Sequence, residues 1–130
     1  MARSGRSPGY QGSLRIIGGL WRGRKLTFTP ADGLRPTPDR VRETLFNWLA
    51  PSIRGARCLD LFAGSGALGL EALSRGAAYC DFVDTSAAAI RQIGLHLQTL
   101  HAGDRARCHQ GPALTFLQDD RACHDIVFID

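Results

Sequence analysis

The spacing of apolar residues along the chain changes at about residue 57. Beyond that point, short continuous apolar runs predict buried β-strands at residues 57–62, 79–84, 105–109 and 125–129. Segments with helical spacing lie between them, at residues 67–74, 87–100 and 113–119. In the longest of these segments one stripe carries Ile90, Ile93, Leu97 and Leu100. Strands and helices in alternation predict a doubly wound α/β sheet of parallel strands, which binds its ligand at the carboxyl ends of the strands.

The first part of the chain follows other patterns. Residues 1–13 are rich in Arg, Gly and Ser, and we expect them to form a disordered basic tail. Residues 14–30 predict a short β-hairpin, because strand-like residues flank Gly18 and Gly19 and a second break occurs at Gly23. The aromatic, aliphatic and cationic side chains of this hairpin would suit contacts with phosphates and bases. They would equally suit a plain edge hairpin that its cations keep soluble.

A helix is predicted between residues 37 and 50. We expect Thr37 to cap it, Pro38 to take the first helical position and Pro51 to end it. Its apolar face is expected to carry Val41, Leu45, Trp48 and Leu49. The hairpin and this helix form a predicted N-terminal unit, residues 14–50, in front of an α/β unit at residues 51–130.

The composition fits one globular domain. The chain has 130 residues, of which 44% are apolar, which is enough for a core and too many for a disordered chain. No apolar run approaches the ~20 residues of a membrane helix, and the first residues lack the apolar segment of a secretory signal. The cysteines at positions 58, 80, 108 and 123 show neither a C-x-x-C pair nor zinc-finger spacing. We therefore expect reduced thiols, no metal and a cytoplasmic location.

The net charge of +4 is unevenly distributed. Residues 1–57 carry eleven basic and three acidic side chains, whereas residues 58–130 carry five basic and nine acidic ones. A basic front on an acidic body indicates an anionic partner, and nucleic acid is the first candidate. All basic residues except Lys25 are Arg, so an Arg-rich composition without any partner is the alternative.

The turn after the first predicted strand of the α/β unit carries a ligand-binding motif. Gly64, Gly66 and Gly69 fit the pattern G-x-G-x-x-G at the start of a helix. Glycine there allows a tight turn and lets a ligand approach the backbone closely. Asp84 ends the second predicted strand of this unit, where a carboxylate accepts hydrogen bonds from ribose hydroxyls. These features fit a nicotinamide dinucleotide as well as a methyl donor.

Asp60 favours the methyl donor. It lies four residues before Gly64, where its carboxylate would repel a pyrophosphate at the helix N-terminus. The same carboxylate would attract the ammonium and sulfonium groups of S-adenosylmethionine, whose ribose would meet Asp84. A tight turn with purely structural glycines is the remaining alternative, and the two well-placed acids argue against it.

Five segments of the chain share their pattern with one known family: residues 15–19, 21–26, 34–37, 39–49 and 59–66. In them the chain resembles the bacterial 16S ribosomal RNA guanine-N2 methyltransferases, class I enzymes that use S-adenosylmethionine. Residues 35–47 are the more family-specific signal, whereas the motif at 60–69 marks class I methyltransferases in general. The resemblance implies a Rossmann-like sheet whose first four strands follow the order 3-2-1-4, with the hairpin and helix in front of it.

The resemblance also implies which residues bind the methyl donor. The methionine part would lie along Asp60, Phe62, Ala63, Gly64, Ser65 and Gly66, on the same glycine motif that Gly69 completes. The ribose would meet Asp84, the adenosine Thr85, and the adenine the stretch Gly111, Pro112 and Ala113. Many members of the family carry a polar side chain where Pro112 stands, so a contact there would come from the backbone or from packing.

The reaction that the resemblance implies is methylation of a guanine exocyclic amine during assembly of the small ribosomal subunit. In this family an acid or amide, followed by Pro-Pro-aromatic, binds the flipped target base after the fourth strand. Asp130 supplies the acid and is the expected catalytic residue, and the sequence ends there. We therefore expect a partial sequence of a longer enzyme, with an open sheet edge at residues 126–129, weak donor binding and little methyl transfer.

The expected partner is ribosomal RNA or the assembling small subunit, with no membrane, and the complete protein is expected to be a monomer. Candidate RNA contacts on the basic front are Arg15, Trp21, Arg22, Arg24, Lys25, Arg35 and Arg40. Packing is the alternative for Trp21, and salt bridges to Asp39 or Glu43 are the alternative for Arg35 and Arg40. The histidines at 96, 101, 109 and 124 show no ligand spacing and no partner acid, and we expect no catalytic role for them. A NAD(P)-dependent oxidoreductase and a non-catalytic RNA-binding remnant remain alternative functions.

Overall fold

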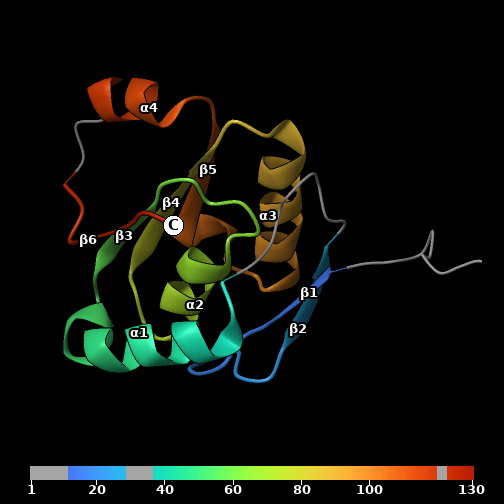
Figure 1. Cartoon of the computed structure of the whole chain (residues 1–130), viewed down its shortest axis with the longest axis vertical. Coiled ribbons are helices and arrows are strands. Elements are labelled where there is room, and N and C mark those ends of the chain that lie inside the picture. Colours follow the sequence, from blue (N-terminus) through green and yellow to red (C-terminus); the bar gives the residue numbers. More distant parts are fainter. Residues whose placement is uncertain (1–11, 29–36, 120–122) are drawn as a thin grey trace, which may run out of the picture.

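A parallel sheet of four strands lies at the centre of the molecule (Figure 1). The computed structural model describes residues 12–28, 37–119 and 123–130. The sheet has the order β5-β4-β3-β6, from β3 (Arg57–Asp60), β4 (Tyr79–Asp84), β5 (Ala106–Gln110) and β6 (Ile126–Phe128). This order is the predicted 3-2-1-4 arrangement, and it is confirmed. Within it Asp60 pairs with Phe82 on one side and with Phe128 on the other.

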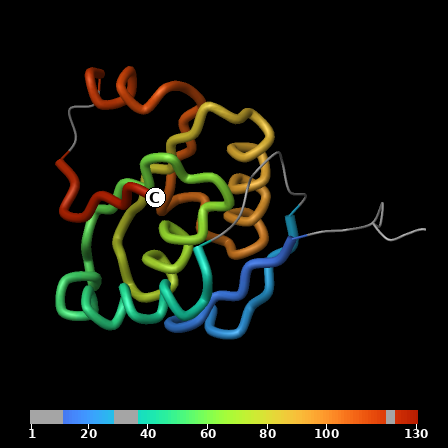
Figure 2. The backbone as a smooth tube through the Cα atoms, in the orientation of Figure 1, coloured from blue at the N-terminus to red at the C-terminus, as the bar shows by residue number. Residues whose placement is uncertain are grey.

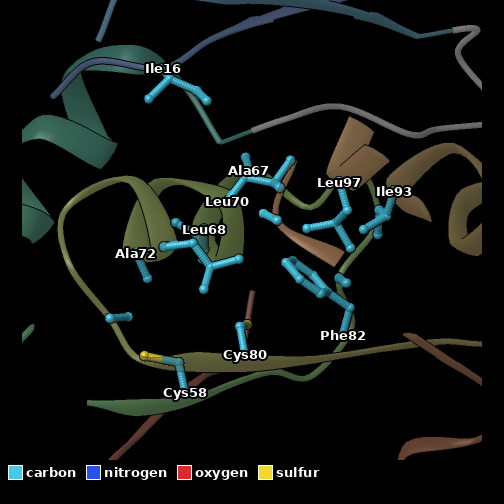
Figure 3. Packing of buried hydrophobic residues seen from close by; sticks show 14 of the residues in the cluster. Ile16, Cys58, Ala67, Leu68, Leu70, Ala72, Cys80, Phe82, Ile93 and Leu97 are labelled. Atoms are coloured by element: carbon cyan, nitrogen blue, oxygen red, sulfur yellow. The ribbon is translucent and has the colours of Figure 1, made fainter. Parts of the chain in front are cut away.

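Two hydrophobic clusters form on the two faces of the sheet. The larger lies beneath α2 (Ala67–Ser74) and α3 (Ala87–Thr99), where Cys58, Cys80 and Phe82 pack against both helices (Figure 3). The smaller joins Leu59, Leu61 and Val83 to α4 (Ala113–Asp119) on the opposite face. Neighbouring strand residues such as Cys58 and Leu59 point to opposite faces, because the side chains of a strand alternate. The chain thus builds a three-layer α/β unit.

The helices of this unit lie where the apolar pattern predicted them. Every residue of α2 is buried, as its nearly continuous apolar sequence implies. The Ser86 side chain caps α3 by accepting a hydrogen bond from the Ala89 backbone N–H at 3.1 Å. A short 3-10 turn, η1 (Gly103–Arg105), then leads into β5.

The N-terminal residues form the predicted hairpin, with β1 (Gly12–Arg15) antiparallel to β2 (Lys25–Phe28). Figure 2 shows it in blue along one side of the molecule, next to α3. Leu14, Ile16 and Phe28 are buried in the larger cluster, so the hairpin shares the core of the sheet. A ring nitrogen of His96 on α3 also lies 2.9 Å from the Thr27 carbonyl oxygen. Packing and this polar contact together fix the hairpin on the α/β unit.

The helix α1 (Asp39–Ile53) differs from its prediction at both ends. Pro38 is the N-cap rather than the first helical residue, and Thr37 makes no capping bond. The Thr37 hydroxyl instead donates a hydrogen bond to the Asp130 carboxylate, at 2.7 Å. Pro51 does not end the helix, because the carbonyl that loses its partner belongs to Asn47, which is exposed to water.

The predicted apolar face of α1 was right for Leu45 and Leu49, which pack against the larger cluster, and wrong for the other two residues. Val41 and Trp48 are exposed, at 52% and 77%, and the buried residues are Arg42, Phe46 and Ile53. Arg42 is only 1% exposed because its guanidinium group forms an ion pair with Glu71 of α2, with 3.0 Å between Nη1 and Oε1. The helix is therefore rotated relative to the prediction, so that a charged residue faces the interior.

Glu71 connects three parts of the molecule. Its carboxylate accepts backbone hydrogen bonds from Ile17 at 3.0 Å and Gly18 at 2.9 Å, next to β1. It also pairs with Arg42 of α1 and with Arg75 just beyond α2. Such a buried acid is stable because every oxygen has a partner. The hairpin and α1 are therefore fastened to the helix that follows the glycine motif.

The strand ends and the cysteines complete the comparison with the sequence. The first strand of the α/β unit ends at Asp60 rather than residue 62, because Phe62 adopts a left-handed conformation with a φ of 62°. The cysteines are free thiols as predicted, and burial, the main cause, raises the pKa of Cys58 to about 11. On β6, Val127 is 47% exposed, so the expected open edge is present in the described sheet. Within the described ranges no helix is long and apolar enough to cross a bilayer.

Candidate functional site

The loop between β3 and α2 forms the floor of the candidate site. Gly66 sits at the N-cap of α2 with a φ of 81°, a left-handed conformation that favours glycine. The Ala63 backbone N–H donates to the Val83 carbonyl at 2.8 Å, which holds the loop against β4. Phe62 points outward and is 52% exposed. The Ser65 hydroxyl is turned inward and accepts a bond from the Ala67 N–H at 3.3 Å.

Asp60, at the end of β3, is buried beneath this loop. It is 1% exposed, and its Oδ2 accepts the Gly69 backbone N–H at 2.9 Å. Gly69 is itself in close contact with the sheet, because a Cβ there would lie 2.3 Å from the Phe82 ring. Burial, followed by the negative charges of Asp130 and Asp84, raises the pKa of Asp60 to about 7, against the opposing effect of the Gly69 bond. The carboxyl group is thus poised to ionise when a cation arrives.

Asp84, at the end of β4, supports the loop from its other side. Its Oδ2 accepts the Gly64 N–H and its Oδ1 accepts the Ser86 N–H, both at 2.8 Å. A carboxylate has about four acceptor positions, so two stay available for hydroxyl donors. Asp84 therefore links the glycine loop to the start of α3 while it retains acceptor capacity toward the site.

A cavity of about 520 Å³ opens at the carboxyl ends of β4 and β5. Its lining includes Val83, Gln110, Gly111, Pro112 and Phe116. The sequence placed Gly111 and Pro112 at the adenine, and the structure brings both to this cavity. Of the neighbouring candidates, Thr85 is exposed and accepts a bond from Gln110 through its carbonyl, and Ala113, the first residue of α4, packs against the smaller cluster.

A cluster around Asp81 on β4 was missed by the sequence interpretation. Nε2 atoms of His109 and His124 each lie 2.8 Å from one of its carboxylate oxygens. Burial opposes ionisation of Asp81, yet the bonds from the two histidines hold its pKa below its usual range. The expectation that these histidines have no partner acid was therefore wrong. An acid inside an apolar strand was the available signal, because a buried carboxylate requires partners.

The carboxylate of Asp130 lies near the glycine loop. The Leu61 backbone N–H donates to the Phe128 carbonyl at 3.0 Å, so the residues after β6 run beside the loop after β3 (Figure 1). The charge of Asp130 also contributes to the raised pKa of Asp60. Asp60, Asp84 and Asp130 thus lie together at the carboxyl ends of the strands β3, β4 and β6.

The candidate RNA contacts divide into exposed and buried residues. Arg15, Arg22, Arg24, Lys25 and Arg40 are exposed. Trp21 is buried in the larger cluster, where its backbone N–H donates to the Ser74 hydroxyl at 3.0 Å. Asp39 pairs with Arg42. Arg35 lies outside the described residues, and no group of acids, histidines and cysteines suited to a metal occurs among those described.

The glycine loop after the first strand of the parallel sheet, with acids at the adjacent strand ends, defines a Rossmann-like methyltransferase fold. The chain belongs to the family described as Conserved hypothetical protein 95, whose model matches residues 14–130.

Known proteins similar to the chain agree with this class. It is 55% identical over 127 residues to the Ribosomal RNA small subunit methyltransferase D of Escherichia coli K12, covering 96% of this chain and 64% of the relative. The protein of the same name from Haemophilus influenzae is 47% identical, with coverage of 95% and 66%. A solved structure of the yhhF protein of Escherichia coli superimposes with a TM-score of 0.83 at 55% identity, over 92% of this chain and 64% of that one. The chain therefore spans about two thirds of the length of these relatives.

Proposed function

We propose that this protein transfers a methyl group from S-adenosylmethionine to the exocyclic N2 amine of a guanine in 16S ribosomal RNA. The proposal rests on one observation above all: the glycine loop lies between a buried acid, Asp60, and a second acid, Asp84. The names of the relatives, methyltransferases of small-subunit ribosomal RNA, support the reaction and the class of substrate. We place the reaction in the cytoplasm and expect the complete protein to act as a monomer.

The residues present fit the methyl donor. The cavity of about 520 Å³ would take the adenine end of the donor, because its lining comes from the ends of β4 and β5 and from α4, and the glycine loop, Asp60 and Asp84 lie outside that lining. Gly111 and Pro112 would border the adenine there, and Asp84 would accept bonds from the ribose. Asp60 and the loop from Phe62 to Gly66 would hold the methionine part. When bound, the donor supplies a methyl group activated by a sulfonium centre.

The carboxylate near the loop would receive the target base. Asp130 would accept a hydrogen bond from the exocyclic amine of the guanine, which turns the nitrogen lone pair toward the methyl group. The nitrogen would bond to the methyl carbon while the carbon–sulfur bond breaks, which leaves S-adenosylhomocysteine, and the proton that the amine loses would pass to water at the exposed Asp130. Catalysis of this kind depends mainly on alignment of the reacting atoms.

The exposed cations of the hairpin would position the RNA. Arg15, Arg22, Arg24 and Lys25 would contact phosphates, and Arg40 would extend this surface onto α1. Arg35, which lies between these segments in the sequence, is included on the same grounds. The buried Trp21 would support the surface from below, since its ring packs into the core.

Calorimetry and a methyl-transfer assay test the proposal together. S-adenosylhomocysteine should bind and NADH should not, because the carboxylates around the loop repel a pyrophosphate. Radiolabelled methyl should then pass from S-adenosylmethionine to small ribosomal subunits from cells that lack the modification. RNA in which inosine replaces guanine is the matched control, because inosine lacks only the N2 amine. Binding of NADH, or equal labelling of the inosine RNA, would contradict the proposal.

A further inference from the structure

One hydrogen bond joins the N-terminal unit to the candidate catalytic acid. The hydroxyl of Thr37, just before α1, donates to Oδ2 of Asp130 at 2.7 Å, across 93 positions of sequence. Both residues lie outside the regular elements, and Asp130 is exposed. Without a partner, an exposed aspartate side chain would rotate among several rotamers. The bond restricts this rotation at the site where the target base would arrive.

Thr37 is held in place by buried groups. Nε of Arg42 donates to the Thr37 carbonyl at 3.2 Å, and Nη1 of the same side chain donates to Glu71 at 3.0 Å. Arg42 is 1% exposed and Glu71 is fully buried, so this connection is shielded from water. Because Glu71 lies on α2, Thr37 is fixed relative to the helix that begins at the glycine loop.

The strand that precedes Asp130, β6, is fixed to α1 and to the glycine loop. The Phe128 ring packs against Phe46 of α1, with 5.6 Å between the ring centroids. The Phe128 carbonyl accepts the Leu61 N–H, which ties the end of β6 to the glycine loop. Thr37 and Asp130 are therefore brought together by two independent sets of contacts, one through Arg42 and one through Phe46.

We propose that Thr37 is a positioning residue, which orients the Asp130 carboxylate toward the target amine. This inference rests on the proposed function. The Thr37 hydroxyl takes one acceptor position on Oδ2 and fixes the plane of the carboxylate, so Oδ1 is presented to the amine N–H in one orientation. A fixed acceptor aligns the nitrogen lone pair with the methyl group, and such alignment lowers the barrier to transfer. Thr37 would not touch the substrate itself and would act only through Asp130.

The substitution Thr37→Val tests this role, because valine has nearly the same shape as threonine and lacks the hydroxyl. When Thr37→Val is made in the protein expressed from its own gene, we expect kcat for methyl transfer to small subunits to fall about tenfold relative to the wild type. The KM for small subunits and the Kd for S-adenosylhomocysteine should change by less than about twofold, because the hairpin cations supply most of the RNA contacts and the glycine loop holds the donor. Thr37→Ser retains the hydroxyl and should restore kcat. Thr99→Val is the matched control, since among the described residues the Thr99 hydroxyl donates to the Leu95 carbonyl, within α3.

Carbon-13 spectra of protein labelled at the aspartate side-chain carboxyl groups supply a second measurement. The Asp130 signal should move in Thr37→Val and stay in place in Thr37→Ser. Equal kcat in wild type and Thr37→Val, or equal loss in Thr37→Ser, would overturn the positioning role while leaving the proposed function intact. Absence of transfer by the wild type despite donor binding would overturn the proposed function, and this inference with it.

Discussion

Asp60 shows how far a single residue can be interpreted from sequence. Its position at the end of a strand, four residues before Gly64, was predictable from the pattern of the motif. Its burial and its bond to the Gly69 N–H were not, because they depend on how closely α2 packs onto β4. Near pH 7 the Asp60 carboxyl group is therefore only partly ionised. Its negative charge, which favours a cationic methyl donor over a pyrophosphate, is then incomplete. A cationic ligand would restore it, since a nearby positive charge favours the ionised form.

The raised pKa of Asp60 predicts how stability depends on pH. Below about pH 4 the carboxyl is protonated in both the folded and the unfolded state. Between about pH 4 and about pH 7 the folded protein keeps a proton that the unfolded chain releases, so this group lowers stability as the pH rises. Asn does not titrate. The free energy of unfolding of the wild type, relative to Asp60→Asn, should therefore fall by about 2–4 kcal/mol across this window.

Denaturant titrations at pH 4 and pH 8 would measure this difference. Asp104→Asn serves as the control for the loss of a carboxylate, because Asp104 is an exposed aspartate on η1. A constant difference between wild type and Asp60→Asn at both pH values would contradict the burial of this acid.

At the scale of elements, α1 shows why a helix can be predicted correctly while its buried face is predicted only in part. The pattern method assigns apolar residues to the interior, which placed Val41 and Trp48 there. The structure turns Arg42 inward instead, because its partner Glu71 lies on a helix 29 residues further on. No local pattern reveals a pair that is formed between distant elements. The strands and helices of the α/β unit were predictable because their apolar residues face the core directly.

Replacement of Arg42 should leave the buried Glu71 carboxylate without one of its two cationic partners. In Arg42→Leu the buried Glu71 would keep Arg75 but lose its fully buried cation, so we expect a loss of about 3–5 kcal/mol in the free energy of unfolding. Arg40→Leu, an exposed change on the same helix, should alter it by about 0.5 kcal/mol or less. Chemical denaturation of the two variants gives the comparison. Equal effects would mean that the Arg42–Glu71 pair does not hold α1.

At the scale of the whole molecule, the parallel sheet followed from the alternation of strands and helices, and the strand order followed from the family resemblance. The sequence did not reveal that the hairpin shares the main core or that Glu71 fastens it to α2. These contacts join residues more than 50 positions apart, such as Gly18 and Glu71. The described hairpin is thus attached to the unit that carries the glycine loop.

This attachment gives the hairpin cations a measurable role. The triple variant Arg22→Gln, Arg24→Gln, Lys25→Gln should weaken binding of ribosomal RNA and reduce the slope of log K against log salt by about 2–3. The affinity for S-adenosylhomocysteine should not change, because these side chains are exposed and none of them lines the cavity. Arg91→Gln on α3 is the control for loss of a surface charge. An unchanged salt slope in the triple variant would remove the hairpin from the RNA surface.

The two tryptophans offer a way to follow the molecule in solution. Trp21 is 7% exposed within the hairpin, whereas Trp48 is 77% exposed on the outer side of α1. An indole in an apolar interior emits at shorter wavelength than one in water and is shielded from acrylamide. Replacement of Trp48 by Phe would leave a single fluorophore at the joint between hairpin and sheet. Its emission would then report, in real time, whether that joint opens when RNA or a methyl donor is added.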